Sequence, residues 1–189
     1  MSFAAALKQF PELETKRLRL RQITEADAPA YYRGLSAMPH TSAWLDGLAS
    51  EHIEKTRAAI RSQNNYFARA KTVIPWAMVN RRGTFIGFVR LSNIYYRSRA
   101  ELAYWVAKRN WNKGFMTEAV EAVIAFGFEQ LRLHRIYATA DVDNVGSQRV
   151  LAKVGFRKEG VLRKHGRLAG EWRDSIMYGL LGDRPSNGA

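Results

Sequence analysis

Hydrophobic and polar residues alternate early in the chain, over Lys16–Ile23, where leucines mark one face and arginines the other. This period of two predicts a half-buried strand. A helix is expected from Thr24, because the carboxylates that follow it suit the first turn of a helix. A second helix is expected from Ser50, and the loop between the two helices, Pro39–Gly47, holds Trp44.

Strand-like runs dominate the middle of the chain. Three of them with short connections predict an antiparallel meander, over Val73–Asn80, Thr84–Ile94 and Ala100–Ala107. An apolar stripe at helical spacing predicts a long helix over Asn112–Gln130. The remaining pattern predicts a strand, a short helix and two strands, over Ile136–Ala140, Asn144–Val154, Phe156–Leu162 and Trp172–Leu181. The order β-αα-βββ-α-β-α-ββ is that of an α/β (α+β) domain with a mixed sheet.

Size and composition narrow the class of protein. The 189 residues suffice for one domain, expected over residues 1–182, with 183–189 as a flexible tail. The absence of cysteine excludes disulfides, thiolate metal sites and a cysteine nucleophile. No metal is expected, because the histidines are scattered, at His40, His52, His134 and His165. No run approaches the ~20 apolar residues of a membrane span, and no signal peptide is visible, so we expect a cytoplasmic protein.

The net charge of +13 adds information about partners. A basic surface favours nucleic acid, an acidic protein or a phosphorylated ligand. The densest basic stretch comprises Arg157, Lys158, Arg163, Lys164, His165 and Arg167. If these side chains share a face, they could dock on ribosomal RNA or on an acidic protein, and the alternative is a solvated pair of strands.

A candidate anion site lies between the strand that ends at Ala107 and the helix that follows. The connection is basic and polar, and Gly114 stands where the helix begins. Backbone N–H groups at a helix start have no intrahelical partner, and the helix dipole is positive there, so phosphate binds well. Arg109 and Lys113 add positive charge. The alternative is an ordinary strand–helix turn with glycine for tightness.

A second motif covers residues 143–156, DNVGSQRVLAKVGF. Asn144 is expected to cap a short helix, Ser147 lies one turn inside it, and Gly155 is a plausible stop. Taken alone, Asn144 would be only a cap and Ser147 only a surface serine.

The two motifs together resemble the GNAT superfamily of acetyl-CoA-dependent N-acetyltransferases, and in particular its RimJ/RimL-type branch, the ribosomal-protein-alanine N-acetyltransferases. The likeness covers roughly Glu14 to Leu181, and the segments that carry it are ETKRLRLRQITEADAPAYY, FIGFVRLSNI, AELAYWV, WNKGFMTEAVEAVIAFGFEQLRLHRI, DNVGSQRVLAKVGFRKEGVLR and GEWRDSIMYGLL. It implies a mixed, mostly antiparallel sheet of about six to seven strands, splayed at its centre and flanked by about four helices. It also implies acetyl-CoA as co-substrate, a primary amine as acceptor, and direct attack without a metal.

The same resemblance suggests which residues hold acetyl-CoA. The family's pyrophosphate loop reads Gln/Arg-x-x-Gly-x-Gly/Ala, and Arg109–Gly114 fits it except that Asn112 replaces the first glycine. Asparagine tolerates a positive φ better than most residues, so the loop should survive. The expected contacts run along the central strand, the loop and the second motif: Tyr104, Trp105, Val106, Arg109, Asn112, Lys113, Gly114, Phe115, Met116, Thr117, Asn144 and Lys153, with Arg149 as a further candidate.

Catalytic roles also follow from the resemblance. Glu101, at the start of the central strand, is the expected base, and the backbone N–H near Val106 should meet the oxyanion. The alternative for Glu101 is a surface ion pair with Arg97 or Arg99. Many relatives place a tyrosine acid at the position of Leu151, so that role does not carry over, and Ser147 is assigned to the departing thiolate. Tyr104 and His134 are weaker alternatives for that contact.

The nature of the acceptor stays open at this point. An α-amine titrates near ~8 and a lysine near ~10.4, so the α-amine is roughly a few hundred times richer in its neutral form at neutral pH. This favours a protein N-terminus, with Trp44 and the segment Arg163–Trp172 lining the opening. The alternatives are a small-molecule amine or antibiotic acceptor, a non-catalytic acyl-CoA-binding protein and a nucleic-acid-binding domain. The protein is expected to be a monomer or a homodimer.

Overall fold

One eight-stranded sheet organises the protein. The computed structural model describes residues 7–36, 52–168 and 171–182. In these residues the strands are β1 (Leu13–Glu14), β2 (Leu18–Gln22), β3 (Ile74–Asn80), β4 (Phe85–Tyr95), β5 (Arg99–Val106), β6 (Arg135–Asp141), β7 (Arg157–Leu168) and β8 (Glu171–Leu181). The helices are α2 (Ala28–Ser36), α4 (Ile53–Ala70), α5 (Phe115–Glu129) and α6 (Val145–Lys153), with short 3-10 turns at Glu25–Asp27 and Lys108–Asn110.

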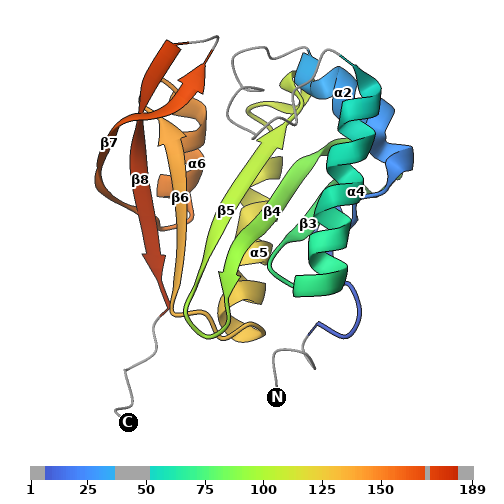
Figure 1. Cartoon of the computed structure of the whole chain (residues 1–189), viewed down its shortest axis with the longest axis horizontal. Coiled ribbons are helices and arrows are strands. Elements are labelled where there is room, and N and C mark those ends of the chain that lie inside the picture. The colour runs from blue at the N-terminus through green and yellow to red at the C-terminus, as the bar shows by residue number, and fades with distance from the viewer. Residues whose placement is uncertain (1–6, 37–51, 169–170, 183–189) are drawn as a thin grey trace.

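The centre of the sheet differs from the rest in its pairing. The strand order is β1-β2-β3-β4-β5-β6-β8-β7, and every neighbouring pair is antiparallel except β5 and β6. Those two strands run parallel and pair over three residues, from Arg99–Arg135 to Glu101–Tyr137. Beyond this point they diverge toward their carboxyl ends (Figure 1). The molecule therefore has a gap in the middle of its sheet, as the resemblance implied.

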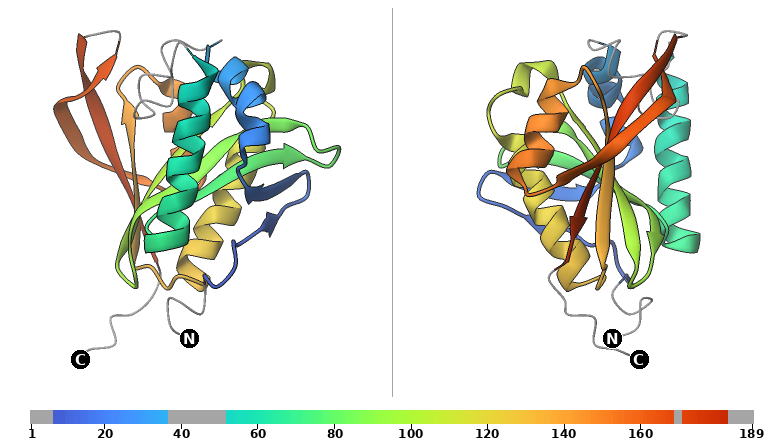
Figure 2. Two further views of the ribbon diagram at one scale, coloured as in Figure 1. Left: turned by 45° about the vertical axis from the view of Figure 1, so that its right-hand side comes forward. Right: turned by 90° about the vertical axis from the view of Figure 1, so that its left-hand side faces the viewer.

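Helices cover both faces of the sheet (Figure 2). One core lies on the α5 and α6 face, where Trp76 meets Phe126 edge to face with ring centres 5.7 Å apart. A second, smaller core lies under α2 and α4, where Tyr31 meets Trp105 at 4.8 Å. Because successive strand residues point to opposite faces, Tyr104 joins the first core while its neighbour Trp105 joins the second.

The structure confirms the predicted fold and shifts several boundaries. It adds the two-residue strand β1 to the seven predicted strands. The helix predicted from Thr24 begins with a 3-10 turn, and the long helix begins at Phe115, because Gly114 before it has the left-handed φ of 74°. β7 continues to Leu168, past the predicted end, because two shifts of register let it stay paired with β8.

Several predictions concern residues that the structure does not describe. Trp44, its loop Pro39–Gly47 and the start of a helix at Ser50 lie outside the described residues, as does the expected tail 183–189. Among the described residues, no helix is long and apolar enough to span a membrane.

Candidate active site

In the part of the chain that the structure describes, the edge of β5 that faces β6 has no strand partner from Leu102 to the end of the strand at Val106. The N–H of Ala107 donates to the carbonyl of Ile86 on β4, at 3.1 Å. Because backbone groups alternate along a strand, those of Tyr104 and Val106 point away from β4, into the gap. The three-residue ladder with β6 ends before it reaches them. This edge can therefore accept an extended, amide-containing ligand as if it were another strand.

Trp111 closes part of that edge. Its indole Nε1–H donates to the carbonyl oxygen of Val106 at 2.9 Å, while 45% of the side chain remains exposed. At Val106 the N–H is consequently the group left for a ligand. No role was predicted for Trp111, although it lies within the loop motif Arg109–Gly114.

The loop after β5 has the backbone of an anion site. Asn112 and Gly114 both have positive φ, 57° and 74°, on either side of Lys113. Such alternation turns neighbouring N–H groups toward one concavity. The first intrahelical hydrogen bond of α5 joins the N–H of Glu118 to the carbonyl of Gly114, at 3.1 Å, so the N–H groups before it have no helical partner. The departure from the family pattern at Asn112 is thus accommodated in the backbone.

The side chains of the loop after β5 and of the start of α5 contribute less to the anion site than the backbone does. Met116 is buried in the core, so only its main chain can face a ligand. Arg109 is exposed, and its Nη2 lies 3.5 Å from the carbonyl of Phe85, on the side of β4. Lys113 is exposed on the loop, and Lys153 is exposed in the last turn of α6.

Two hydroxyl groups meet across the gap. The phenol oxygen of Tyr104, on β5, lies 3.0 Å from Oγ of Ser147 and donates to the Ser147 carbonyl at 3.2 Å. Ser147 is fixed at the start of α6, because its N–H donates to Oδ1 of Asn144 at 3.0 Å. Burial raises the pKa of Tyr104 above its ordinary value, so the phenol keeps its proton at neutral pH. The structure thus brings together three residues that the sequence analysis had placed at the site.

Glu101 lies on the other face of β5. Glu101 and Tyr104 are three positions apart on the strand, so their side chains point to opposite sides of the sheet. Its Oε2 accepts a hydrogen bond from Nδ2 of Asn93 at 2.8 Å. Asn93 belongs to an irregular stretch of β4, where it has a φ of 49°. Sequence periodicity gives no sign of this irregularity, which is why Asn93 was missed.

The alternative role of Glu101 is that of a surface carboxylate in an ion pair. Within the described residues, no ion pair joins Glu101 to Arg97 or Arg99. Burial raises the pKa of nearby Tyr137, and the negative charge of Glu101 adds to the effect. The carboxylate of Glu101 is therefore held by a neutral amide.

Cross-strand neighbours give the Glu101 face its character. Ser92 lies opposite Glu101 and Arg90 lies opposite Ala103, on the face that also carries Trp105. Ala103 is partly exposed between bulkier residues, so the strand surface is low there. The small side chain of Ala103 is therefore surrounded by polar groups on this face of the sheet, those of Glu101, Arg90 and Ser92.

Comparison with known proteins identifies the family. The model of the GNAT acetyltransferase domain matches residues 17–157. The chain therefore belongs to the GNAT family of N-acetyltransferases, as its motifs indicated. In the described residues, no group of three or more His, Cys, Asp or Glu side chains is placed to hold a metal ion.

Relatives and solved structures narrow the position of the chain within that family. It is 37% identical to the uncharacterized N-acetyltransferase YoaA of Bacillus subtilis, over 93% of this chain and 99% of that protein. It is 33% identical to the [ribosomal protein uS5]-alanine N-acetyltransferase of Escherichia coli, over 50% of each chain. The structure of Mycobacterium smegmatis RimJ, in complex with CoA-disulfide, superposes with a TM-score of 0.78 and 26% identity, over 91% of this chain and 87% of that one. The chain is RimJ/RimL-like within the family.

Proposed function

We propose that this protein transfers the acetyl group of acetyl-CoA to the N-terminal α-amine of a protein, of the ribosomal-protein type, in the cytoplasm. The observation that carries the proposal is the short ladder between β5 and β6. This short ladder leaves the backbone groups of Tyr104 and Val106 facing a gap. The loop that follows β5 leads directly to the free N–H groups at the start of α5. The ribosomal-protein-alanine acetyltransferase among the relatives supports this acceptor class.

The residues present suit acetyl-CoA as co-substrate. Gly114 has no Cβ, so an oxygen can approach the backbone of the loop closely. The N–H groups from Asn112 to Thr117 would bind the diphosphate. The backbone from Tyr104 to Val106 would pair with the pantetheine arm, with the amide of Asn144 beside it. Lys153 or Arg149 would reach the 3′-phosphate.

Chemistry is then divided between the two faces of β5. Glu101 takes the proton that the amine nitrogen loses as it forms its bond to the thioester carbon. The Val106 N–H donates to the oxygen that becomes negative. The carbon–sulfur bond breaks, and the phenol of Tyr104, positioned by Ser147, donates a hydrogen bond to the departing thiolate. The amine thus enters from the Glu101 face and the sulfur leaves toward α6.

Assignment of the thiolate contact to Tyr104 refines the expectation for Ser147. A serine hydroxyl is a poor acid, whereas a phenol is a better donor, and the two hydroxyls are 3.0 Å apart. Ser147 acts on the thiolate through the phenol that it orients. This arrangement needs no residue at the position of Leu151, whose side chain is fully buried.

A panel of amines tests the proposed acceptor. Acetyl-CoA is offered with peptides beginning with Ala or Ser, lysine peptides blocked at the N-terminus, polyamines and aminoglycosides, and thiol release is followed. The free N-terminal peptides should react fastest, because an α-amine titrating near ~8 supplies more neutral nucleophile than a lysine. Faster reaction of a polyamine or an antibiotic would replace the proposed acceptor with a small molecule.

Substitution of the base tests the proposed mechanism. Glu101→Gln should lower kcat by about 10²–10⁴-fold, the range of general base catalysis, and leave the KM for acetyl-CoA close to that of wild type. Asn93→Ala should lower kcat less, because it loosens the carboxylate without removing it. A Glu101→Gln enzyme with unchanged kcat would exclude Glu101 as the base.

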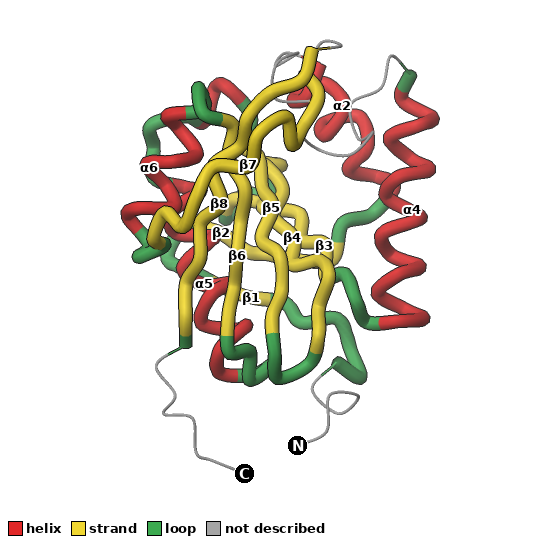
Figure 3. Tube along the Cα trace, turned by 60° about the vertical axis from the view of Figure 1, so that its left-hand side comes forward, coloured by secondary structure: helices red, strands yellow, loops and turns green. Residues whose placement is uncertain are grey.

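The basic stretch on β7 suits docking to ribosomal RNA. β7 is an edge strand, and Figure 3 shows the β7–β8 hairpin rising beyond β6. The six basic residues named in the sequence analysis are exposed, and the guanidinium of Arg167 lies 5.3 Å from the ring centre of Trp172. Charged residues also protect an edge strand from pairing with other chains. Binding to ribosomes that weakens steeply with salt would support the RNA contact, and salt-insensitive binding would refute it.

A further inference from the structure

Arg17, immediately before β2, reaches the anion-binding loop from a distant part of the sequence. Its Nη1 donates to the carbonyl oxygen of Lys113 at 2.8 Å. Its guanidinium carbon lies 4.6 Å from the centre of the Phe115 ring. Its Nη2 lies 3.3 Å from the position that a Cβ on Gly114 would take. One side chain therefore contacts Lys113 and Phe115, the residues on either side of Gly114, in the turn into α5.

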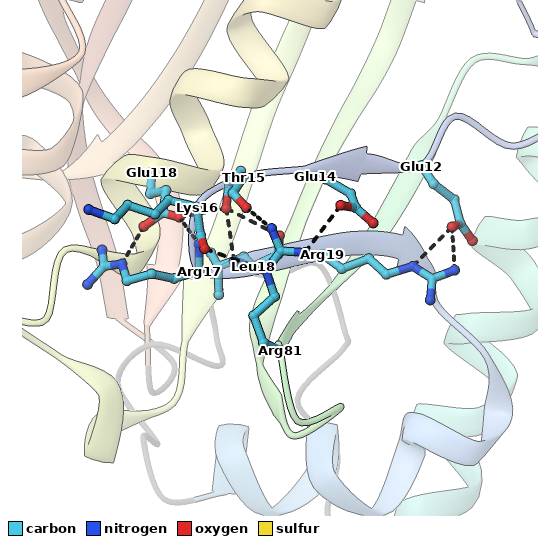
Figure 4. Close-up of polar contacts among 9 residues, drawn as sticks. All are labelled: Glu12, Glu14, Thr15, Lys16, Arg17, Leu18, Arg19, Arg81 and Glu118. Carbon is cyan, nitrogen blue, oxygen red and sulfur yellow. Dashed lines mark hydrogen bonds and ion pairs between the residues drawn. The ribbon is translucent and has the colours of Figure 1, made fainter.

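Arg17 is itself held in place by α5. Its Nε donates to Oε2 of Glu118 at 2.6 Å, and its backbone N–H donates to Oε1 of the same carboxylate at 2.7 Å. Thr15 donates its hydroxyl to that oxygen as well, at 2.6 Å. Figure 4 shows these contacts converging on Glu118. The turn between β1 and β2 is thus tied to the first turn of the helix.

Arg81 secures the same turn from its other side. Its guanidinium hydrogen-bonds to the carbonyl of Thr15 and lies 3.2 Å from the carboxylate of Glu14 (Figure 4). Arg17 therefore extends toward the loop from a turn that is held at two places, and its direction is fixed before any ligand arrives.

The contact with Lys113 has a specific physical consequence. Positive φ values on both sides of Lys113 are typical of a turn whose N–H groups face one concavity, and the carbonyl oxygen of Lys113 is turned toward Arg17. A peptide in such a turn could rotate and present its carbonyl oxygen to an anion, which would repel it. A guanidinium bound to that oxygen opposes the rotation, because a charge-assisted hydrogen bond would have to break.

We propose that Arg17 is a positioning residue that keeps the loop at Asn112–Gly114 in its anion-binding conformation. The inference rests on the proposed function, in which this loop binds the diphosphate of acetyl-CoA. Arg17 acts through the carbonyl of Lys113 and the ring of Phe115, and not on the reacting atoms.

The test compares two acetyl donors, acetyl-CoA and S-acetylpantetheine, which lacks the diphosphate and the nucleotide. Arg17→Ala should raise the KM for acetyl-CoA by about tenfold, the effect of losing one charge-assisted hydrogen bond. It should leave kcat, and both constants for S-acetylpantetheine, within about twofold of wild type. A purely structural defect would change the reaction with both donors alike and would overturn the inference.

Further variants distinguish the positioning role of Arg17 from a simple effect of its positive charge. Arg17→Lys keeps the charge but loses the forked contacts, so its KM for acetyl-CoA should remain raised by several-fold. If Arg17→Lys behaves as wild type, charge alone acts and the positioning role is refuted. Should Arg17→Ala fail to fold, Glu118→Gln provides the same test, because it weakens the anchor of the guanidinium outside the loop. Its KM should rise for acetyl-CoA only.

Arg19 supplies the matched control. It is the next arginine on the same strand face and pairs with Glu12 at 2.6 Å, away from α5 (Figure 4). Arg19→Ala should leave the kinetics with both donors unchanged. If wild-type protein uses neither donor and shows no calorimetric binding of CoA, the proposed function fails. If wild type is active and Arg17→Ala has an unchanged KM, only this inference fails.

Discussion

Replacing Tyr104 by phenylalanine removes one oxygen atom from the centre of the site. That oxygen contacts the hydroxyl of Ser147 at 3.0 Å and its carbonyl at 3.2 Å. The ring itself packs against the larger core and would remain. Tyr104→Phe therefore tests the phenol without opening a large cavity.

The magnitude follows from the acidities involved. A thiol ionises near ~8.5 and a phenol near ~10, and burial moves the pKa of Tyr104 further upward, so full transfer of its proton to the thiolate is unfavourable by about 2 kcal/mol or more. The phenol thus contributes a hydrogen bond to an anion, about 1.5–3 kcal/mol. We expect kcat to fall by roughly 10–100-fold. The KM for acetyl-CoA should stay within about twofold, because the thiolate forms only in the transition state.

The assay follows thiol release with acetyl-CoA and an N-terminal alanine peptide, both saturating. Tyr66→Phe is the control, since Tyr66 is 56% exposed on α4, and its kcat should equal that of wild type. Ser147→Ala combined with Tyr104→Phe should lose no more activity than Tyr104→Phe alone, because both changes act on one contact. A Tyr104→Phe enzyme with a kcat within about twofold of wild type would refute the assignment.

Four further predictions concern stability and the loop. Gly87→Ala would place a Cβ 2.4 Å from the backbone oxygen of Trp105, so it should lower Tm by roughly 10 °C. Gly160→Ala meets no atom within 4 Å, so calorimetry should show a Tm within about 2 °C of wild type. Asn112→Gly should retain the KM for acetyl-CoA, whereas Asn112→Val should raise it and cost about 1–2 kcal/mol in urea unfolding, because a branched residue resists a φ of 57°. Burial raises the pKa of Tyr31 and of Tyr104, so the folded state holds their protons more tightly than the unfolded chain. The stability that these tyrosines contribute is therefore fully present below pH ~10, and the unfolding free energy should fall as the pH rises above that value, less steeply in Tyr31→Phe; urea midpoints that stay flat between pH ~10 and pH ~11 would contradict this.

Much of the fold could be predicted, because the local pattern of hydrophobic and polar residues indicates most of its helices and strands. The alternation around Leu18 and the stripe along α5 each identify one element and its buried face. The left-handed backbone at Asn112 was also expected from the residue type and its place in the family motif. These features depend on neighbours in sequence, which a single chain displays directly.

The contacts that complete the site depend on tertiary structure. Asn93 reaches Glu101 through an irregular stretch of β4, and Tyr104 reaches Ser147 across the gap beside β5. Arg17 contacts a loop almost a hundred positions further along the chain, with a separation of 96 residues to Lys113. The family motifs indicated Glu101, Tyr104 and Ser147, but nothing in the local pattern around Asn93 or Arg17 distinguishes these two from ordinary surface residues.

The brevity of the β5–β6 ladder has a mechanical meaning. Five strands, β1 to β5, form one panel, and β6, β8 and β7 form a second, and three residue pairs join the two. Few backbone hydrogen bonds therefore connect the two parts of the sheet. A donor molecule whose amides hydrogen-bond in the gap would link the two parts of the sheet. Binding of acetyl-CoA should therefore also make the enzyme more rigid.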